Sequence, residues 1–396
     1  MLGFTLKDDA VSLVLDQDVA LADTGDLMTI TLLSPREDSV RHATEVQVST
    51  EVCLKSQYLG PMIRIAEKDP TNITVGGELK REGPNKYGEK EGEHKEGALV
   101  WLAHLHNLSQ TRMGELGLHN VSITAVWHAI RMWRYYEKEE DVKALQEWFN
   151  KWYDTAIANT QLNLDAARSL ALPCQVFDHA VGFARANKYL AYHNIGRIKE
   201  CHPKGVNIRA LHLAPNDFIG PSNHARGGLK TTLHKMIWKK ANNILRFDTE
   251  KCNCWDATIG QYLAALVQVD AFPIEDVVKR SSINEIVERL KQFQFDYSPT
   301  CRRCRSIDFV YVVKMTIQAA ENYFDGLCLD CMNRSKPKGK DLDDEYWRIN
   351  KSSMNHWDTR CRSKHNQSSW YVSWLGRDDT RQKLLKGDSG YREEED

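Results

Sequence analysis

Cys301-Arg-Arg-Cys304 and Cys328-Leu-Asp-Cys331 are two Cys-x-x-Cys knuckles, separated by an apolar run from Ile307 to Phe324. Each knuckle offers two thiolates, and a tetrahedral zinc ion binds four such ligands. The apolar run predicts a buried helix, which we expect to bring the two knuckles together around one ion. This stretch therefore predicts a helical region that is held in shape by a structural metal.

Two further pairs of candidate metal ligands flank this stretch. Cys252-Asn-Cys254 precedes it, and Cys361 follows it with His365 one helical turn later. Together with the knuckles they are enough for two four-coordinate zinc sites, which would be structural because closed Cys-rich sites seldom catalyse. The alternative is that the cysteines pack as small hydrophobic side chains. The candidate ligands are Cys252, Cys254, Cys301, Cys304, Cys328, Cys331, Cys361 and His365.

The composition predicts an intracellular globular protein. The chain has 396 residues, of which 42% are hydrophobic, enough to form a substantial core. Its net charge of −1 gives no overall attraction to nucleic acid or to anionic membranes, so nucleic-acid binding would need a local basic patch. The 10 cysteines, with no signal peptide and no apolar run long enough to span a membrane, predict a reducing compartment, the cytoplasm or the nucleus.

Residues 1–120 show a pattern that predicts a small α+β domain. Asp26–Leu33 and Thr44–Ser49 predict the two strands of a hairpin, because apolar and polar residues alternate in them. Ser49 precedes a helical segment and is expected to cap it. The charged, glycine-rich stretch 67–97 has almost no apolar side chain to bury, so we expect a solvated loop there.

The segment that follows predicts a helical domain with an aromatic core. Its tryptophans recur at helical spacing, which favours inward packing over a platform for stacking bases. Pro173 is expected at the start of a further helix. The tryptophans are Trp127, Trp133, Trp148 and Trp152.

The segment 223–246 carries the best basic patch of the chain. Its Lys and Arg residues recur at three- to four-residue spacing, which places them along one helix face. Gly227-Gly228 is expected at the start of that helix, where backbone N–H groups and the helix dipole favour a phosphate. The alternative is an amphipathic helix with a solvated charged face. The candidate phosphate- or RNA-binding residues are Arg226, Lys230, Lys235 and Lys239.

These patterns predict an α+β fold, with a small N-terminal hairpin and helix unit followed by a mainly α-helical body. The Cys-rich part of that body is expected to be stapled by structural zinc. The expected divisions are 1–120, a helical domain over 121–250, the Cys-rich region over 251–377, and a charged tail over 378–396.

Several motifs resemble a family of filamentous-fungal proteins related to the BTB/POZ domain. The most specific is Tyr323-Phe-Asp-Gly-Leu-Cys-Leu-Asp-Cys331, and Phe177-Asp-His-Ala180 and Asn223-His-Ala-Arg-Gly227 agree with it. The N-terminal hairpin and capped helix also resemble the opening of the BTB/POZ fold. The resemblance implies a non-enzymatic interaction protein that binds a protein partner through its BTB-like domain.

A second resemblance is to fungal arginine-containing cyclodipeptide synthases, which condense aminoacyl-tRNAs. That family carries an Asp-Asp-x-x-Glu motif, whereas here Asp343-Asp344 is followed directly by Glu345. The resemblance implies an aminoacyl-tRNA bound by the basic patch, with chemistry that needs positioning and a proton shuttle rather than a nucleophile. The candidate proton-handling residues are Asp178, His179, His212 and His224, while Asp343, Asp344 and Glu345 would bind a substrate guanidinium.

Overall fold

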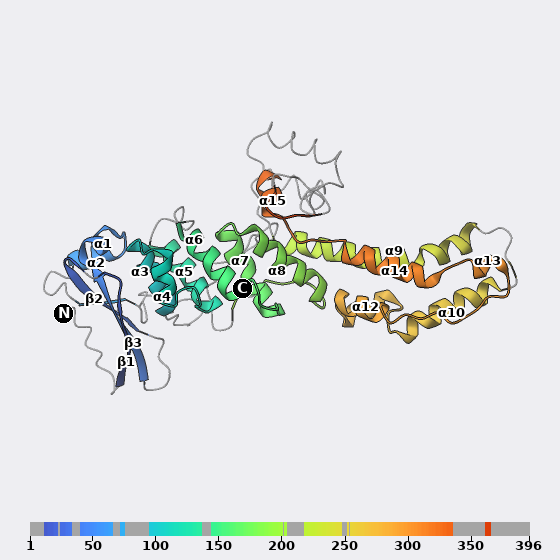
Figure 1. Cartoon of the computed structure of the whole chain (residues 1–396), viewed down its shortest axis with the longest axis horizontal. Helices are drawn as coiled ribbons and strands as arrows, with labels where there is room; N and C mark the ends of the chain where they lie inside the picture. The colour runs from blue at the N-terminus through green and yellow to red at the C-terminus, as the bar shows by residue number, and fades with distance from the viewer. Residues whose placement is uncertain are drawn as a thin grey trace, which may run out of the picture. The chain divides into compact units, whose positions relative to one another are not determined.

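The protein is mainly helical, with one small sheet near its N-terminus, as the sequence predicts (Figure 1). The computed structural model describes residues 12–22, 24–33, 40–65, 72–75, 95–136, 144–200, 202–203, 218–247, 252, 254–335 and 361–365. The chain divides into two compact units. Unit 1 comprises Met1–Gln161, Leu172–His179 and His202–Leu211, and unit 2 comprises Leu162–Ala171, Ala180–Cys201 and His212–Asp396. The four-part division expected from composition stays a prediction.

Unit 1 contains a four-stranded sheet in the order β1-β3-β2-β4. The strands β2 (Leu27–Leu33) and β3 (Val40–Ser49) pair antiparallel, which confirms the predicted hairpin. The strands β1 (Ser12–Ala20) and β4 (Asn72–Val75) add to its two sides in parallel. Parallel pairing joins segments that are distant in sequence, so the hairpin's local alternation gives no sign of either added strand.

The expectation of one continuous loop over 67–97 is wrong at both ends of the stretch. Asn72–Val75 forms β4, and α3 (Lys95–Leu105) begins within the last residues of the stretch. Asn-Ile-Thr-Val has two β-branched aliphatic side chains, which favour a strand, and this segment pairs with the edge of β2. Residues 76–94 lie outside the part of the chain that the structure describes.

One face of the hairpin forms part of the unit 1 core. Met28, Ile30 and Leu32 of β2 are at most 2% exposed, and so are Val46 and Val48 of β3. These side chains alternate with more exposed ones because successive residues of a strand point to opposite faces. The apolar pattern that predicts the hairpin is therefore also the pattern that buries it.

A histidine connects the end of the sheet to the helices. The Oγ of Ser49 accepts a hydrogen bond from the N–H of Val52, which confirms Ser49 as the N-cap of α1 (Thr50–Lys55). The backbone N–H of Ser49 donates to Nε2 of His106 at 3.0 Å, while Nδ1–H of His106 donates to the carbonyl of Leu102 at 2.8 Å. One nitrogen accepts and the other donates, so this contact needs the neutral imidazole. Burial lowers the pKa of His106 accordingly.

The helices of unit 1 surround an aromatic core. Trp127, Trp133, Trp148 and Trp152 are at most 5% exposed, which confirms that they pack inward. Two of these rings also satisfy loop carbonyls, since Nε1 of Trp148 donates to Leu118 and Nε1 of Trp152 donates to Val121. The remaining elements are α2 (Leu59–Ile65), α4 (Gln110–Glu115), α5 (Ile123–Tyr136), α6 (Gln146–Trp152) and the π-helical turn η2 (Tyr153–Ile157).

The expectation that Pro173 starts a helix is wrong. Pro173 lies inside α7 (Leu164–Val176), close to its C-terminal end. Oδ1 of Asn163 accepts a hydrogen bond from the N–H of Ala166 at 2.8 Å, so Asn163 provides the start signal for this helix. A proline removes one backbone hydrogen bond, and the buried apolar residues before it keep the helix intact.

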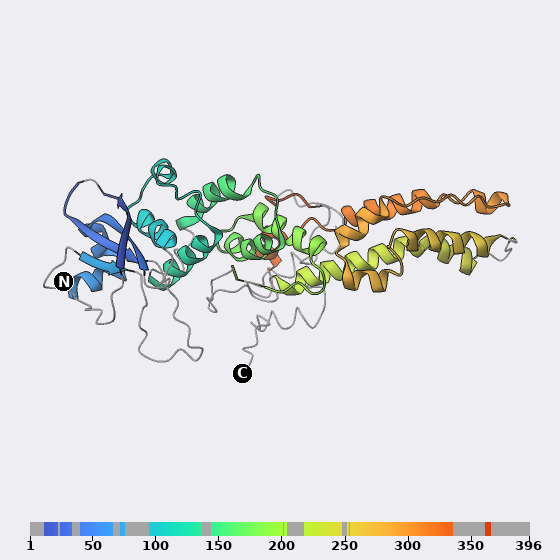
Figure 2. The same ribbon diagram turned by 90° about the horizontal axis from the view of Figure 1, so that it is seen from below.

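Unit 2 is built on a long helix that packs against two others. The helix α8 (Ala180–His193) precedes α9 (Ile219–Phe247), which has 29 residues. Tyr262 of α10 (Trp255–Gln268) donates from its hydroxyl to the carbonyl of Ile237 in α9, and its ring stacks on Phe309 at the start of α14 (Phe309–Glu321). The helices α9, α10 and α14 extend toward the same end of the unit, where α13 (Arg302–Arg305) lies (Figures 1 and 2).

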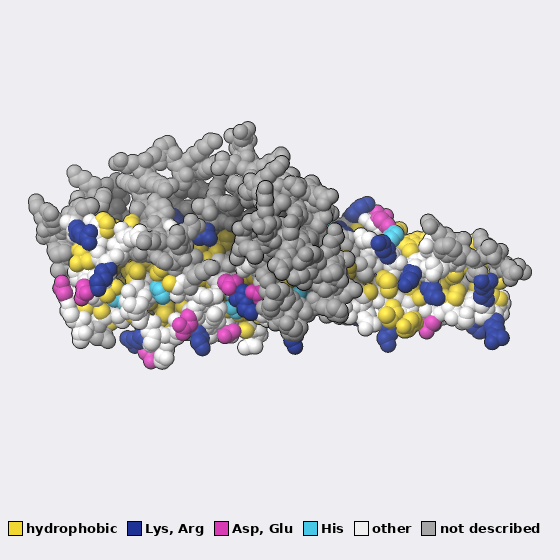
Figure 3. Space-filling view, turned by 90° about the horizontal axis from the view of Figure 1, so that it is seen from above, with side chains coloured by type: hydrophobic (Ala, Val, Ile, Leu, Met, Phe, Trp, Pro, Cys, Tyr) yellow, Lys and Arg dark blue, Asp and Glu magenta, His cyan; other side chains and the backbone are white. Residues whose placement is uncertain are grey.

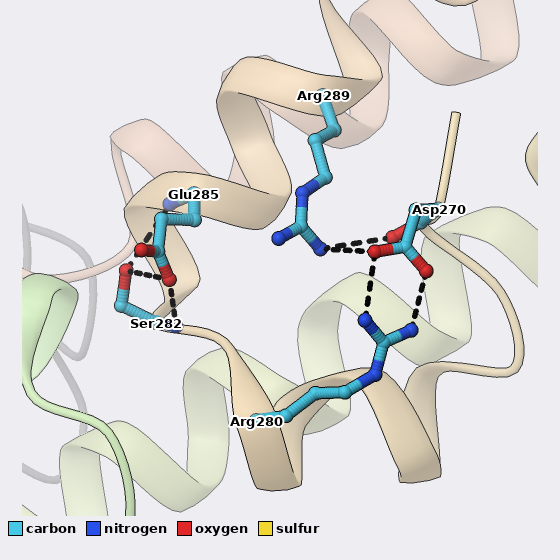
Figure 4. Close-up of polar contacts among 5 residues, drawn as sticks. All are labelled: Asp270, Arg280, Ser282, Glu285 and Arg289. Carbon is cyan, nitrogen blue, oxygen red and sulfur yellow. Dashed lines mark hydrogen bonds and ion pairs between the residues drawn. The ribbon is translucent and has the colours of Figure 1, made fainter.

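The short helices between α10 and α13 are fixed by polar contacts at their ends (Figure 4). Ser282 and Glu285 form a capping box at the start of α12 (Ile283–Leu290). Asp270, just after α10, accepts hydrogen bonds from Arg280 of α11 (Ile274–Arg280), and Arg289 of α12 also binds its carboxylate at 2.9 Å. These contacts, above all the hydrogen bonds from Arg280, lower the pKa of Asp270.

None of the helices in the described part of the chain combines the length and the apolar character that a bilayer crossing requires.

Candidate metal centres

The first cluster of metal-ligating side chains consists of Cys252, Cys254, Cys301 and Cys304, and is called the α13 tetrad below. Cys252 and Cys254 lie in the segment between α9 and α10, and Cys254 is the N-cap of α10. Cys301 is the N-cap of α13, and Cys304 lies within that short helix. Two turns at the same end of unit 2 thus contribute two cysteines each.

The geometry of the α13 tetrad suits a four-coordinate metal. Its ligand atoms all lie within 4.8 Å of one another. The Sγ of Cys252 is 3.3 Å from that of Cys301, 3.2 Å from that of Cys304 and 3.7 Å from that of Cys254. Four sulfurs bound to zinc at about 2.3 Å would lie roughly 3.8 Å apart, so only a small expansion is needed.

Backbone N–H groups support negative charge on these sulfurs. The N–H of Cys304 donates to the Sγ of Cys301 at 3.2 Å. A hydrogen bond from the backbone of Cys301 lowers the pKa of Cys254 to about 6. Burial raises the pKa of Cys304 to about 12, so the tetrad also contains one thiol that needs a cation to ionise.

The second cluster consists of Cys328, Cys331, Cys361 and His365, and is called the α15 tetrad below. Cys328 immediately precedes α15 (Leu329–Ser335), and Cys331 lies in its first turn. The Sγ of Cys331 is 3.6 Å from the Sγ of Cys361 and 3.5 Å from Nε2 of His365. All four residues are buried, at 7% exposure or less.

An ion pair joins the two chain segments of the α15 tetrad. Nε and Nη2 of Arg362 donate to Oδ1 of Asp330 at 2.9 and 2.7 Å, and the backbone N–H of Arg362 donates to Oδ2 at 2.7 Å. Asp330 lies between the two knuckle cysteines, and Arg362 directly follows Cys361. Sequence reasoning missed this contact, although both residues are neighbours of predicted ligands.

The electrostatic environment of the α15 tetrad favours a cation. Burial alone would lower the pKa of His365, but hydrogen bonds to the sulfurs of Cys328, Cys331 and Cys361 raise it to about 12. Three sulfurs around one imidazole thus attract positive charge strongly. A divalent metal bound to Nε2 would supply this positive charge in place of a proton, and the imidazole would then be neutral.

The eight predicted ligands do come together, but the predicted grouping of the two knuckles around one ion is wrong. Cys301 and Cys304 join Cys252 and Cys254, while Cys328 and Cys331 join Cys361 and His365. The reason is the helix between the knuckles. The 13 residues of α14 span about 20 Å, which holds its flanking turns far apart.

The basic patch on α9 differs from the sequence expectation. Gly227 and Gly228 lie inside α9 rather than at its start, so their N–H groups are not free for a phosphate. A Cβ on Gly228 would lie 2.0 Å from the hydroxyl of Tyr323, which explains the glycine by close packing. Arg226 is only 4% exposed, so its predicted place on the solvated face is also wrong.

Two of the predicted phosphate contacts do lie at the surface. Lys235 and Lys239, one helical turn apart, are exposed, and Lys230 is half-buried. Lys and Arg side chains are also frequent at the right-hand end of the face shown in Figure 3, where acidic side chains are few among the described residues. Nucleic-acid binding by this surface stays a prediction.

Three of the predicted proton-handling residues, Asp178, His179 and His224, lie in the described part of the chain. Asp178 has a positive φ of 53° and lies with His179 in the turn between α7 and α8. The ring of His179, which is half-buried, packs against Tyr153 and Phe149 at centroid distances of 4.2 and 5.8 Å. His224 lies in α9, in the other unit. His212, Asp343, Asp344 and Glu345 lie outside the described residues.

No protein-family model, no curated protein and no solved structure matches this chain.

Proposed function

We propose that this chain is a non-enzymatic interaction protein whose unit 2 is held in shape by two structural zinc ions. The observation that carries the proposal is the pair of tetrads, each with four protein ligands and seven sulfurs among the eight. Four protein ligands complete a tetrahedral shell, so neither ion would keep an open position for substrate or water.

Zinc suits these tetrads better than the other common divalent metals. Calcium and magnesium prefer six or more oxygen ligands, and no carboxylate belongs to either tetrad. Thiolates with an imidazole in a tetrahedral arrangement are typical of zinc, and an all-thiolate tetrad also accommodates iron. Metal analysis of the purified protein distinguishes the two.

Each ion would join a short segment of unit 2 to another part of that unit. The α13 tetrad joins the α9–α10 turn to α13, which has four residues. The α15 tetrad joins α15 to the segment 361–365, which forms neither helix nor strand. Short segments of this kind cannot bury enough apolar surface to order themselves, so a metal would supply the missing stability.

The resemblance of unit 1 to a BTB/POZ domain supports a role in protein binding. The hairpin and the helix capped by Ser49 agree with that resemblance. Unit 1 would then contact the protein partner, while the zinc ions stabilise the helical unit that follows it.

The alternative, synthesis of an arginine-containing cyclic dipeptide from aminoacyl-tRNAs, has lost two of its supports. Arg226 is buried, and Gly227-Gly228 is not at a helix start. Small-molecule extracts from a host that expresses the protein test the two functions directly. We expect no new cyclic dipeptide in those extracts, and the appearance of one that depends on expression would refute the interaction role.

A further inference from the structure

Arg226 is a buried cation for which the described part of the chain provides no anionic partner. It is 4% exposed, and its Nε donates to the backbone carbonyl of Asn194 at 3.1 Å. Its Nη2 is buried and makes no hydrogen bond to a described residue, and none of the ion pairs among those residues includes Arg226. A buried charge is costly unless a counter-charge or a full set of hydrogen bonds compensates it.

A second arginine binds the same asparagine. Nη2 of Arg168, in α7, donates to Oδ1 of Asn194 at 2.7 Å, and Nε of Arg168 is buried without a hydrogen bond to any described residue. The carboxylate of Asp165 is 3.7 Å away and its side chain is 95% exposed, so it compensates Arg168 only weakly. The backbone oxygen and the side-chain oxygen of Asn194 therefore each accept a hydrogen bond from one guanidinium group. Each of these two groups keeps one buried nitrogen that makes no hydrogen bond to a described residue.

A third positive charge lies close by. Lys230 follows Arg226 by one turn of α9, is half-buried, and lies close enough to Arg226 that the two charges repel. Asn194 directly follows α8, whose C-terminal end carries about half a negative charge. That partial charge is too small to balance three cations.

We propose that Arg168, Arg226 and Lys230 bind a small molecule through a phosphate group. A phosphate monoester carries nearly two negative charges, and its oxygens match the planar donors of guanidinium groups. The unused N–H groups of Arg226 and Arg168 are the expected donors, and Asn194 holds both guanidinium groups in place. Because Arg226 is almost completely buried, the site suits a compact ligand rather than a nucleic-acid backbone. This ligand site is independent of the two metal centres and goes beyond the interaction role proposed above.

Inorganic phosphate is a suitable probe for this site. In titration calorimetry of the full-length protein, the wild type should bind phosphate, with chloride at equal ionic strength as the blank. Arg226→Met should weaken that binding by roughly tenfold or more, since a charge-assisted hydrogen bond is lost. Lys314→Met, at an exposed position of α14 outside the basic patch, is the matched control and should bind as the wild type does.

Three results would overturn the proposal. These are a wild type that binds phosphate no better than chloride, an Arg226→Met protein that binds phosphate as well as the wild type, and a Lys314→Met protein that loses as much binding as Arg226→Met. If Arg226→Met does not fold, Arg168→Met provides the same comparison from another helix. Melting temperatures with and without phosphate give a second readout, because the ligand should raise the melting temperature of the wild type but not of either arginine variant.

Discussion

The α13 tetrad and the α15 tetrad contain similar ligands but differ in how the protein surrounds them. Cys252 and Cys301 are half-exposed, whereas every ligand of the α15 tetrad is buried. The α15 tetrad also has the ion pair between Asp330 and Arg362 beside it, while the arginines of α13 are exposed. Similar ligand sets can thus give one centre that solvent reaches and one that it does not.

The largest expected effect is the loss of one ligand from the buried centre. Cys331→Ser removes a fully buried sulfur, so the α15 tetrad should lose its metal and the protein several kcal/mol of stability, given that structural zinc contributes on the order of 10 kcal/mol. Urea unfolding and metal analysis of the variant measure both quantities.

The matched variant in the exposed centre is Cys301→Ser. This variant should also lose one metal ion per chain, but it should lose less stability. Its sulfur is half-exposed, and the α13 tetrad lies at the end of unit 2 toward which α9, α10 and α14 extend. Equal stability losses in the two variants would contradict the difference between the centres.

A chelator should remove the metal from the two centres at different rates. The half-exposed sulfurs of Cys252 and Cys301 allow a chelator to attack the α13 tetrad first, while the α15 tetrad must open before it can be attacked. A colorimetric chelator should therefore release the metal in two phases. The fast phase should be absent in Cys301→Ser and present in Cys331→Ser, and a single phase in the wild type would argue against this order.

A smaller effect is expected from the ion pair next to the α15 tetrad. Arg362→Met removes the two side-chain hydrogen bonds to Asp330 and leaves the one from the backbone, which should cost about 1–2 kcal/mol because Arg362 is partly exposed. Metal should leave the α15 tetrad faster, with the release from the α13 tetrad unchanged. Arg302→Met, at an exposed position of the other knuckle, is the control and should change neither rate.

The smallest effect concerns pH and the contact between Ser49 and His106. Burial lowers the pKa of His106 in the folded state, so the unfolded chain binds a proton more readily. Stability should therefore fall as pH decreases from about 6.5, the unfolded value, toward the lower folded pKa. His106→Gln should flatten this pH dependence in urea unfolding. Arg112→Gln, at an exposed position of unit 1 that keeps its charge throughout this pH range, should leave it unchanged.

Local signals in the sequence predict much of the fold but not the partners of each segment. The hairpin and the Ser49 cap each depend on a few adjacent residues, and both predictions are confirmed. The eight candidate ligands were also identifiable from residue type and spacing. Their grouping was not, because it depends on the path of the chain around α14, which no local pattern encodes.

The charged residues also show that local sequence patterns do not predict contacts with distant segments. Arg226 and Lys235 occur on one helix with similar spacing signals, yet only the structure distinguishes the buried arginine from the exposed lysine. The sequence predicts Gly227-Gly228 at a helix start that favours a phosphate, whereas close packing of Gly228 against Tyr323 accounts for this glycine. Contacts with distant segments decide these cases, and they become visible only in the folded chain.

The most direct test of this account is the number of zinc ions bound by the purified full-length protein, measured by native mass spectrometry and by elemental analysis. We expect two zinc ions per chain in the wild type, and one each in Cys301→Ser and Cys331→Ser. A wild-type protein that is folded and free of metal would contradict the central claim.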